Sequence, residues 1–293
     1  MDTMDTTYIF YHKADHDGCL SAFLVKDWLD KQNRKYCLMP CDYGCEPYDR
    51  LEEIKGNQVF LLDFCFEKEG VMQRIKDDSK SFIWIDHHQK AIQMFQDLNI
   101  QGLQTKEESA CMLTFRYLYP DTRMPEAVER IGLFDCWKHE DRKEIIGFEY
   151  YLQSRELPPD GMEWQFILTL NSEDCDEYSN FGWVSYRKDQ ILNKKILEDF
   201  SFETVLHGYK ILAVNTQTKG SLGFGTRLKE YDFCISFVFT GKLWKYSVYS
   251  SSNDCAEFSH RFYGGGGHKG AAGFQTSVLV LNPLTMKEGN DGK

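Results

Sequence analysis

Acidic and imidazole side chains stand directly after several apolar runs of this sequence. The clearest case is the run from Phe82 to Ile85, which is followed by Asp86, His87 and His88. A short apolar run is typical of a buried strand, and open α/β sheets bind ligands at the carboxyl ends of their parallel strands. An acid and two imidazoles at such an edge favour a metal site over a hydrophobic core.

The first predicted strand, Tyr8 to Tyr11, ends in a similar way. It is followed by His12, Asp15 and Asp17, within the segment His-Lys-Ala-Asp-His-Asp-Gly. Three such groups close together would repel one another and lose solvation unless something positive lay among them. One of the two aspartates could instead cap the following helix, but capping would not explain His12.

Two isolated aspartates complete the set of candidate ligands. Asp63 follows the apolar run Val59 to Leu62, and Asp135 stands in the segment Gly-Leu-Phe-Asp-Cys-Trp. An aspartate after a strand is usually a turn or cap residue, so Asp63 is not diagnostic alone, and Asp135 on its own is unremarkable. The collected strand-end candidates are His12, Asp15, Asp17, Asp63, His87 and Asp135. Such nitrogen and oxygen ligands suit manganese, or magnesium with added imidazole, and their number fits a pair of ions that activates water and clamps phosphoryl oxygens.

A second unusual segment lies near the end of the chain. Four consecutive glycines, Gly264 to Gly267, precede His268 and Lys269. Consecutive glycines cost backbone entropy and are tolerated where something must approach the backbone closely. A run of free amides here could cradle a phosphate or carboxylate, with His268 and Lys269 as added donors. A flexible linker is the alternative, although a linker would continue with polar residues and not with Ala271 to Phe274, which leads into a strand.

Short apolar runs alternate with helical patterns in the first part of the chain. Strands are predicted at 8–11, 36–40, 59–62 and 82–85, and helices near 19–29, 48–54, 71–75, 107–119 and 125–135, with Pro125 as the first helical residue. This alternation predicts an N-terminal doubly wound, mostly parallel sheet with flanking helices. Further strands at 209–215, 232–240 and 244–250, and a helix at 255–262 capped by Asp254, predict a smaller C-terminal mixed α/β domain.

These patterns also predict the domain boundaries. A charged helical pattern with a narrow apolar stripe begins at residue 184 and is interpreted as a connector. We therefore expect a catalytic domain at 1–183, a connecting helix at 184–204, a substrate-binding domain at 205–283 and a polar tail at 284–293. The active site is expected in the cleft between the two domains.

The composition limits the partners and the location of the protein. The chain has 293 residues with 42% hydrophobic residues, enough for two cores. A net charge of -11 argues against a grip on long duplex DNA or RNA, although such acidity also simply keeps proteins soluble. The sequence shows neither an apolar run of about 18 residues nor a signal-peptide pattern, so a cytoplasmic protein without membrane contact is expected. The oligomeric state stays open, and a homodimer is compatible with the sequence.

The ten cysteines are expected to be free thiols, since a chain of this length does not need a disulfide scaffold. Cys37, Cys41 and Cys45 are each separated by three residues. Structural zinc requires a fourth ligand, which is not evident here, so chance or packing is favoured over a metal site.

Four segments resemble, in order, the four motifs of the DHH phosphoesterase superfamily. They are His-Lys-Ala-Asp-His-Asp-Gly, Leu-Leu-Asp, Ile-Asp-His-His and Leu-Phe-Asp-Cys-Trp. The segment Gly-Gly-Gly-Gly-His-Lys-Gly-Ala-Ala-Gly-Phe is similar to the signature of the C-terminal domain that accompanies them. The resemblance covers about residues 8–280, and the segments 107–111 and 125–137 look closest to the small oligoribonuclease branch of the nanoRNase B type.

The resemblance implies a role for each matched residue. One manganese ion would be held by His12, Asp15 and Asp63, and the other by Asp17, Asp63, His87 and Asp135, with Asp63 as the bridge. His88 would point at the scissile phosphate, and Asp86 would orient an imidazole from behind.

The resemblance also implies substrate contacts in the C-terminal domain. They would come from Gly265, Gly266, Gly267 and His268, with Ser250 nearby. Relatives of the nanoRNase A type carry Arg-Ser where this chain has Tyr249 and Ser250, so that cation is missing here. Arg227 or Lys269 could replace it.

The expected function is that of a phosphodiesterase with two Mn²⁺ ions, or Mg²⁺ in their place. It would hydrolyse short oligoribonucleotides or dinucleotides to mononucleotides with metal-activated water. A phosphatase or pyrophosphatase of the same superfamily, acting on adenosine bisphosphate, pyrophosphate or polyphosphate, is one alternative. A nucleotide-binding sensor with little turnover is another, although a pure binder would not need the full ligand set.

Overall fold

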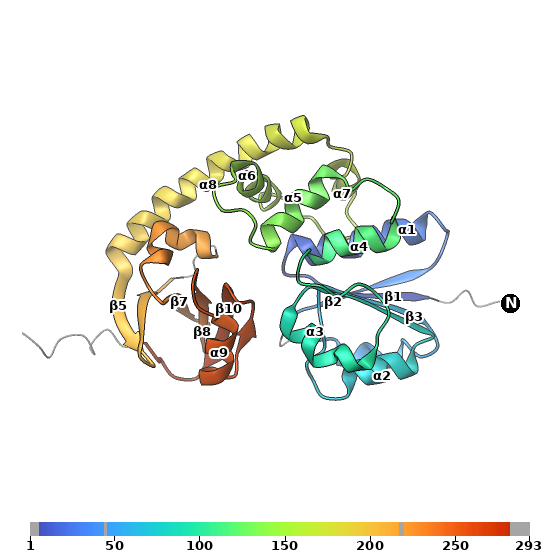
Figure 1. Cartoon of the computed structure of the whole chain (residues 1–293), viewed down its shortest axis with the longest axis horizontal. Helices are drawn as coiled ribbons and strands as arrows, with labels where there is room; N and C mark the ends of the chain where they lie inside the picture. Colours follow the sequence, from blue (N-terminus) through green and yellow to red (C-terminus); the bar gives the residue numbers. More distant parts are fainter. Residues whose placement is uncertain (1–5, 44–45, 217–219, 282–293) are drawn as a thin grey trace, which may run out of the picture. The chain divides into compact units, whose positions relative to one another are not determined.

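The computed structural model describes residues 6–43, 46–216 and 220–281 (Figure 1). The chain divides into two compact units, Met1–Tyr186 and Arg187–Lys293. Within the described ranges, no helix combines the length and the apolar character that crossing a membrane requires. Cys45 and the predicted tail at 284–293 lie outside the described residues.

A four-stranded parallel sheet forms the centre of the first unit. Its strands are β1 (Thr7–His12), β2 (Tyr36–Cys41), β3 (Gln58–Leu62) and β4 (Ser81–Ile85), in the spatial order β2-β1-β3-β4. The four predicted strands are thereby confirmed. The chain leaves β1 toward β2 and then returns to the other side of β1 with β3, so the direction of winding reverses between β1 and β3. Open α/β sheets bind ligands at such a reversal.

Helices cover both faces of this sheet. One face carries α1 (His16–Asp30) and α4 (Ala110–Leu118), and the other carries α2 (Val71–Asp78) and α3 (Gln89–Phe95) (Figure 1). Successive strand residues point to opposite faces. Accordingly, Ile9 packs in the core under α1 and α4, whereas its neighbour Phe10 packs in the core under α2. Burial on both faces explains the continuous apolar runs, and the doubly wound prediction is confirmed.

The remaining helices of the first unit pack together on the α1 and α4 side. They are α5 (Glu126–Asp135), α6 (Lys143–Leu152), α7 (Glu163–Ile167) and the first part of α8 (Ser172–Phe200). The short 3-10 helices η1 (Tyr48–Glu52) and η2 (Gln96–Leu98) pack in the core on the α2 and α3 side instead. Their shared core contains Phe23, Phe148 and Trp164. Two helix predictions need correction. Pro125 directly precedes α5 and is not its first helical residue. The helix that was predicted to begin at residue 184 begins twelve residues earlier, at Ser172.

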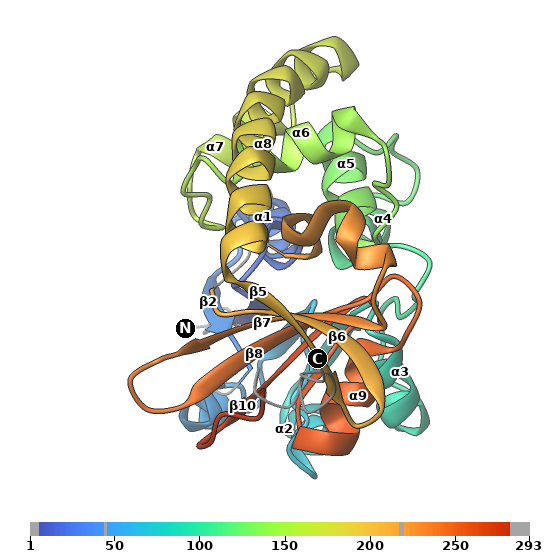
Figure 2. The same cartoon turned by 90° about the vertical axis from the view of Figure 1, so that its left-hand side faces the viewer.

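A six-stranded mixed sheet forms the second unit (Figure 2). In spatial order its strands are β5 (Ser201–Leu206), β6 (Tyr209–Val214), β7 (Phe233–Phe239), β8 (Trp244–Tyr249), β10 (Ala271–Thr276) and β9 (Gly266–Gly267). The 3-10 helix η3 (Ser221–Lys229) lies between β6 and β7 in the chain. The helix α9 (Cys255–Tyr263) packs on one face through Phe258. The carboxylate of Asp254 accepts a hydrogen bond from the Glu257 amide at 2.9 Å, which confirms the predicted cap.

The predicted mixed α/β fold with two sheets is therefore confirmed. Strands β5 and β9 were not predicted, since β5 continues directly from α8 and β9 contains only two residues. The cysteines within the described ranges are free thiols, as expected. The functional division into a catalytic and a substrate-binding domain stays a prediction.

Candidate metal centre

The first group of candidate ligands lies at the ends of β1 and β3. Nδ1 of His12 lies 2.8 Å from Oδ2 of Asp15 and 3.5 Å from Oδ2 of Asp63. The other oxygen of Asp15 accepts a hydrogen bond from the Gly18 amide at 2.9 Å, so Asp15 both caps α1 and faces His12. A Cβ on Gly18 would lie 2.1 Å from the His12 carbonyl oxygen. Glycine is therefore required for α1 to begin against the end of β1.

Asp63 lies between this group and a second one. Its φ of 54° is in the left-handed region, which aspartate tolerates better than most residues with a side chain. Oδ2 faces His12, whereas Oδ1 lies 3.4 Å from Nε2 of His87. Oδ1 is buried like the rest of the side chain, and the His87 imidazole faces it. A buried carboxylate whose two oxygens face different imidazoles is suited to joining two cations.

The second group surrounds His87. Its Nε2 lies 3.0 Å from Oδ2 of Asp135 and 3.9 Å from Oδ2 of Asp17. Asp135 is the last residue of α5, as the helix predicted near 125–135 implies, so it should not have been grouped with the strand-end candidates. The two oxygens of Asp17 accept hydrogen bonds from the amides of Ala110 and Cys111 at 2.8 and 2.9 Å. The positive amino end of α4 thus fixes the Asp17 carboxylate.

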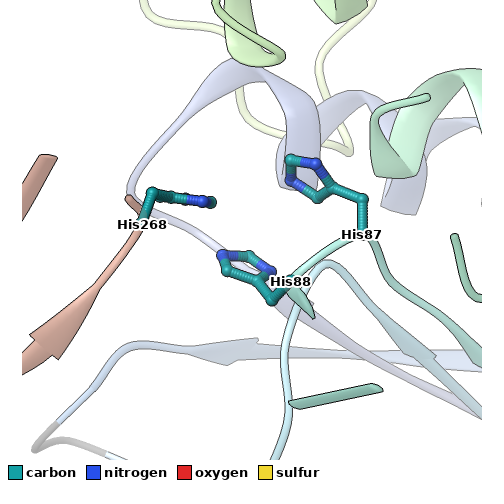
Figure 3. Close-up of side chains that lie close together, drawn as sticks. All are labelled: His87, His88 and His268. Carbon is teal, nitrogen blue, oxygen red and sulfur yellow. The ribbon is translucent and has the colours of Figure 1, made fainter. Parts of the chain in front are cut away.

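The third residue group follows β4. Oδ1 of the fully buried Asp86 accepts hydrogen bonds from the amides of His87 and His88 at 2.7 and 3.1 Å, and it lies 2.6 Å from Nδ1 of His88. Figure 3 shows the two imidazoles extending from this segment, whereas the labelled His268 belongs to the second unit. Asp86 therefore fixes both the backbone turn and the orientation of the His88 ring.

The crowding of acids and imidazoles shifts the pKa values of the metal-free protein. Burial alone would lower the pKa of His12, but hydrogen bonds and charges from Asp15 and Asp63 raise it to about 11. Burial also works against the charged form of His88, yet Asp86 and Asp63 raise its pKa to about 9. Burial and the charges of Asp63 and Asp135 raise the pKa of Asp17 to about 8.

The same surroundings shift the pKa values of two further groups in the cluster. Burial would lower the pKa of His87, but hydrogen bonds with Asp135 and Asp63 raise it. Burial would raise the pKa of Asp86, but the charge and hydrogen bond of His88 lower it. The metal-free cluster thus holds protons on several groups that a cation would displace.

The residues present fit divalent cations. Three ligand sets each have their donor atoms within 4.8 Å of one another: His12, Asp15 and Asp63; Asp17, His87 and Asp135; and Asp63, Asp86 and His88. Buried carboxylates such as Asp17 and Asp63, 1% and 2% exposed, are costly side by side unless positive charge lies among them. The structure thus brings together every ligand candidate of the first unit, while their roles stay a proposal.

Two supporting contacts were not predicted. His16, which lies between the candidate ligands Asp15 and Asp17, contacts Glu149 of α6 with 2.9 Å between Nδ1 and Oε1. The indole of Trp84 donates a hydrogen bond of 3.0 Å to the Phe64 carbonyl, directly after Asp63. The sequence indicates neither contact, because both join residues far apart in the chain. Glu149 is 133 residues from His16 and Phe64 is 20 residues from Trp84, and no local pattern marks either pair.

The glycine segment of the second unit differs from its prediction. The amide of Gly265 donates to the Ser259 carbonyl at 3.0 Å, and that of His268 donates to the Ala271 carbonyl at 2.7 Å. Gly266 and Gly267 pair with β10. A Cβ on Gly265 would lie 2.2 Å from the Gly273 carbonyl oxygen. The expected run of free amides is therefore wrong: strand β10 is what approaches this backbone closely. Substrate binding by this segment stays a prediction.

Two of the other predicted substrate contacts, Ser250 and Arg227, already have structural partners. The Ser250 hydroxyl donates to the Asp232 carbonyl and accepts from the amides of Ser252 and Asn253, at 2.8, 3.1 and 2.9 Å. These bonds use its one donor and both acceptor positions. The Arg227 guanidinium contacts Tyr231 and Glu230. Lys269 is exposed.

Three comparisons relate this chain to known proteins. Residues 6–133 match the model of the DHH family, N-terminal domain, a range that contains the first three ligand segments and ends just before Asp135. An uncharacterized protein of Acanthamoeba polyphaga mimivirus is 26% identical over 297 residues, which covers 92% of this chain and 68% of that protein.

One solved structure shows the same fold. An exopolyphosphatase-related protein from Bacteroides fragilis is similar with a TM-score of 0.52 at 18% identity, over 94% of this chain and 88% of that one. The structure of the exonuclease RecJ bound to manganese has a TM-score of 0.49 at 12% identity, over 93% of this chain and 86% of that one. At 18% identity, the likeness to the exopolyphosphatase-related protein concerns the fold alone.

Proposed function

Because the match over residues 6–133 and the two-sheet fold support the DHH superfamily for this chain, we propose that the protein is a manganese-dependent phosphodiesterase. The same family match supports the coarser assignment of a metal-dependent phosphoester hydrolase. The proposed substrates are short oligoribonucleotides or dinucleotides, and the products are mononucleotides. One observation carries the proposal: the two oxygens of Asp63 face His12 and His87, so one carboxylate joins two ligand groups.

The proposed ligands follow the two groups around Asp63. His12, Asp15 and Asp63 would hold one cation, and Asp17, Asp63, His87 and Asp135 would hold the other. When bound, such a pair supplies a water-derived nucleophile at neutral pH and clamps phosphoryl oxygens. Imidazole and carboxylate ligands suit manganese, and magnesium is the alternative.

His88 is the proposed contact to the scissile phosphate. Its Nδ1 donates a short hydrogen bond to Asp86, which fixes the ring plane, and the pKa of about 9 keeps a proton on both ring nitrogens at neutral pH. Nε2 of the oriented ring would then donate a hydrogen bond to a phosphoryl oxygen. Asp86 would act by positioning this donor and would not touch the substrate.

We propose a short substrate, and the reason is the acidity of the protein. With a net charge of -11, the chain is poorly suited to gripping a long nucleic acid through phosphate neutralisation. Because the glycine amides of the second unit largely serve its own sheet, we propose His268 and Lys269 side chains as the donors for the far phosphate. Neither localisation nor oligomeric state enters this proposal.

A panel of substrates tests the proposed function. Purified protein with Mn²⁺ is incubated with the 5′-phosphorylated adenine dinucleotide pApA, adenosine bisphosphate, pyrophosphate and polyphosphate, and the products are separated by chromatography. We expect mononucleotides from the dinucleotide, and loss of this activity in Asp63→Asn. Asp97→Asn, on the exposed η2 helix, is the matched control and should retain activity.

Other outcomes would point elsewhere. Faster phosphate release from pyrophosphate, polyphosphate or the bisphosphate would support a phosphatase or pyrophosphatase instead. Tight nucleotide binding without turnover in Mn²⁺ would support a sensor. Full activity of Asp63→Asn would contradict the metal centre itself.

A further inference from the structure

Trp137 has an exposed indole, and its backbone lies beside the candidate metal centre. It lies two residues after Asp135, whose carboxylate is 3.0 Å from His87, and 38% of its surface is exposed. Two residues of chain span at most about 7 Å. The backbone that carries the indole is therefore close to the proposed position of the scissile phosphate.

The turn that contains Trp137 does not require this side chain. Its amide donates to the Phe134 carbonyl at 3.0 Å, and the Lys138 amide donates to the Leu133 carbonyl at 2.9 Å, which ends α5. Trp137 has a φ of 59°, in the left-handed region that glycine usually occupies at this point of a helix end. A bulky residue is disfavoured there, so neither the turn nor local propensity explains the indole.

The indole is braced from one side by other rings. His139 is 8% exposed and stacks on Phe134, with 4.6 Å between the ring centroids and 23° between the planes. Nδ1 of His139 also lies 3.1 Å from the Phe134 carbonyl oxygen. The Trp137 ring lies 5.9 Å from the His139 ring. Trp137 is thus supported by an ordered aromatic pair while more than a third of its own surface meets solvent.

We infer that the exposed face of Trp137 is a stacking subsite for a nucleobase of the substrate. The inference rests on the proposed function, because it takes the ligand to be a nucleotide whose phosphate lies at the metal centre. Aromatic stacking tolerates any base, since every base has a π face. It also supplies affinity without cations, which suits a chain with a net charge of -11.

Two ligands that differ by the base alone test this subsite. Binding of AMP and of ribose 5-phosphate to the full-length, Mn²⁺-loaded protein is measured by isothermal titration calorimetry. AMP should bind more tightly to the wild type. Trp137→Gly should weaken AMP binding between about fivefold and about a hundredfold, from the usual contribution of one stacked base. Its affinity for ribose 5-phosphate should stay within about twofold, and Trp137→Phe should be intermediate.

The glycine variant also separates binding from folding. Glycine adopts a positive φ without strain, so the urea midpoint of Trp137→Gly should not fall below that of the wild type by a measurable shift. Phe166→Ala, which removes an exposed aromatic ring of α7, is the control and should bind both ligands as the wild type does.

Several results would overturn the subsite. One is that the wild type binds AMP and ribose 5-phosphate with equal affinity. Another is that Trp137→Gly loses affinity for both ligands equally. A third is that the urea midpoint of Trp137→Gly falls together with its affinities for both ligands. The measurement needs no hydrolysis. A protein that cleaves no dinucleotide but shows the base-dependent difference would therefore refute the proposed function and keep the subsite.

Discussion

The carboxylate of Asp86 and Nδ1 of His88 lie 2.6 Å apart, and the same Asp86 oxygen accepts the amides of His87 and His88. One buried oxygen atom thus determines the course of the backbone and the orientation of a ring. This arrangement explains why an acid directly precedes the two histidines.

Replacement of Asp86 should reduce activity without removing a metal ion from the Asp63 pair. Asp86→Asn keeps an oxygen acceptor but loses the charge that orients His88, so we expect a 10- to 100-fold lower kcat, the usual loss for a residue behind the ligands. Dinucleotide cleavage gives kcat and KM, and calorimetry gives the Mn²⁺ stoichiometry. An unchanged kcat, or a loss of one bound ion, would contradict the positioning role.

Manganese should stabilise the fold through the buried carboxylates. Ions that bind only the folded state add about 2.7 kcal/mol at a hundredfold excess over Kd. Thermal unfolding with Mn²⁺ and with a chelator should therefore differ in Tm for the wild type and for Asp97→Asn, and far less for Asp63→Asn. Equal shifts in all three proteins would place the stabilising ions at another site.

Manganese binding should release protons and should tighten as pH rises. The pKa values of His12 and Asp17, about 11 and about 8, lie above neutrality, so both groups hold protons at pH 7 in the metal-free protein. A cation must displace these protons, so affinity should rise from pH 6 to pH 8 by about tenfold per pH unit for each proton released. Calorimetry in buffers of different ionisation enthalpy counts the protons. A count of zero would show that these ligands are not used.

Close packing of α6 on α8 should depend on two glycines. A Cβ on Gly182 would lie 1.9 Å from the Gly147 carbonyl oxygen, and a Cβ on Gly147 would lie 2.2 Å from the Ser179 carbonyl oxygen. These atoms are backbone and cannot move aside, so Gly182→Ala should cost about 1–3 kcal/mol of unfolding free energy. Urea unfolding measures this loss. The exposed Ser185→Ala on the same helix should change stability by less than about 0.5 kcal/mol, and equal values for the two variants would refute the packing.

The sequence by itself determined the strands of the first sheet and the types of the candidate ligands. Both are local properties: an apolar run such as Val59 to Leu62 records burial on two faces, and Asp63 follows it directly in the chain. Because parallel strands end at one edge, His12, Asp63 and His87 could be expected near one another before their distances were known.

Only the tertiary structure decided which contacts fix these ligands. Asp17 is bound by the amide of Ala110, 93 residues away, and His16 by Glu149, and such pairs follow from helix packing and leave no local pattern. The glycines at 264–267 show the same limit. The sequence correctly indicated a close approach to this backbone, but only the register with β10 reveals that the approaching group is the protein's own strand. This pairing spans only a few residues of chain, but its register, like the helix contacts of Asp17 and His16, is decided when the chain folds.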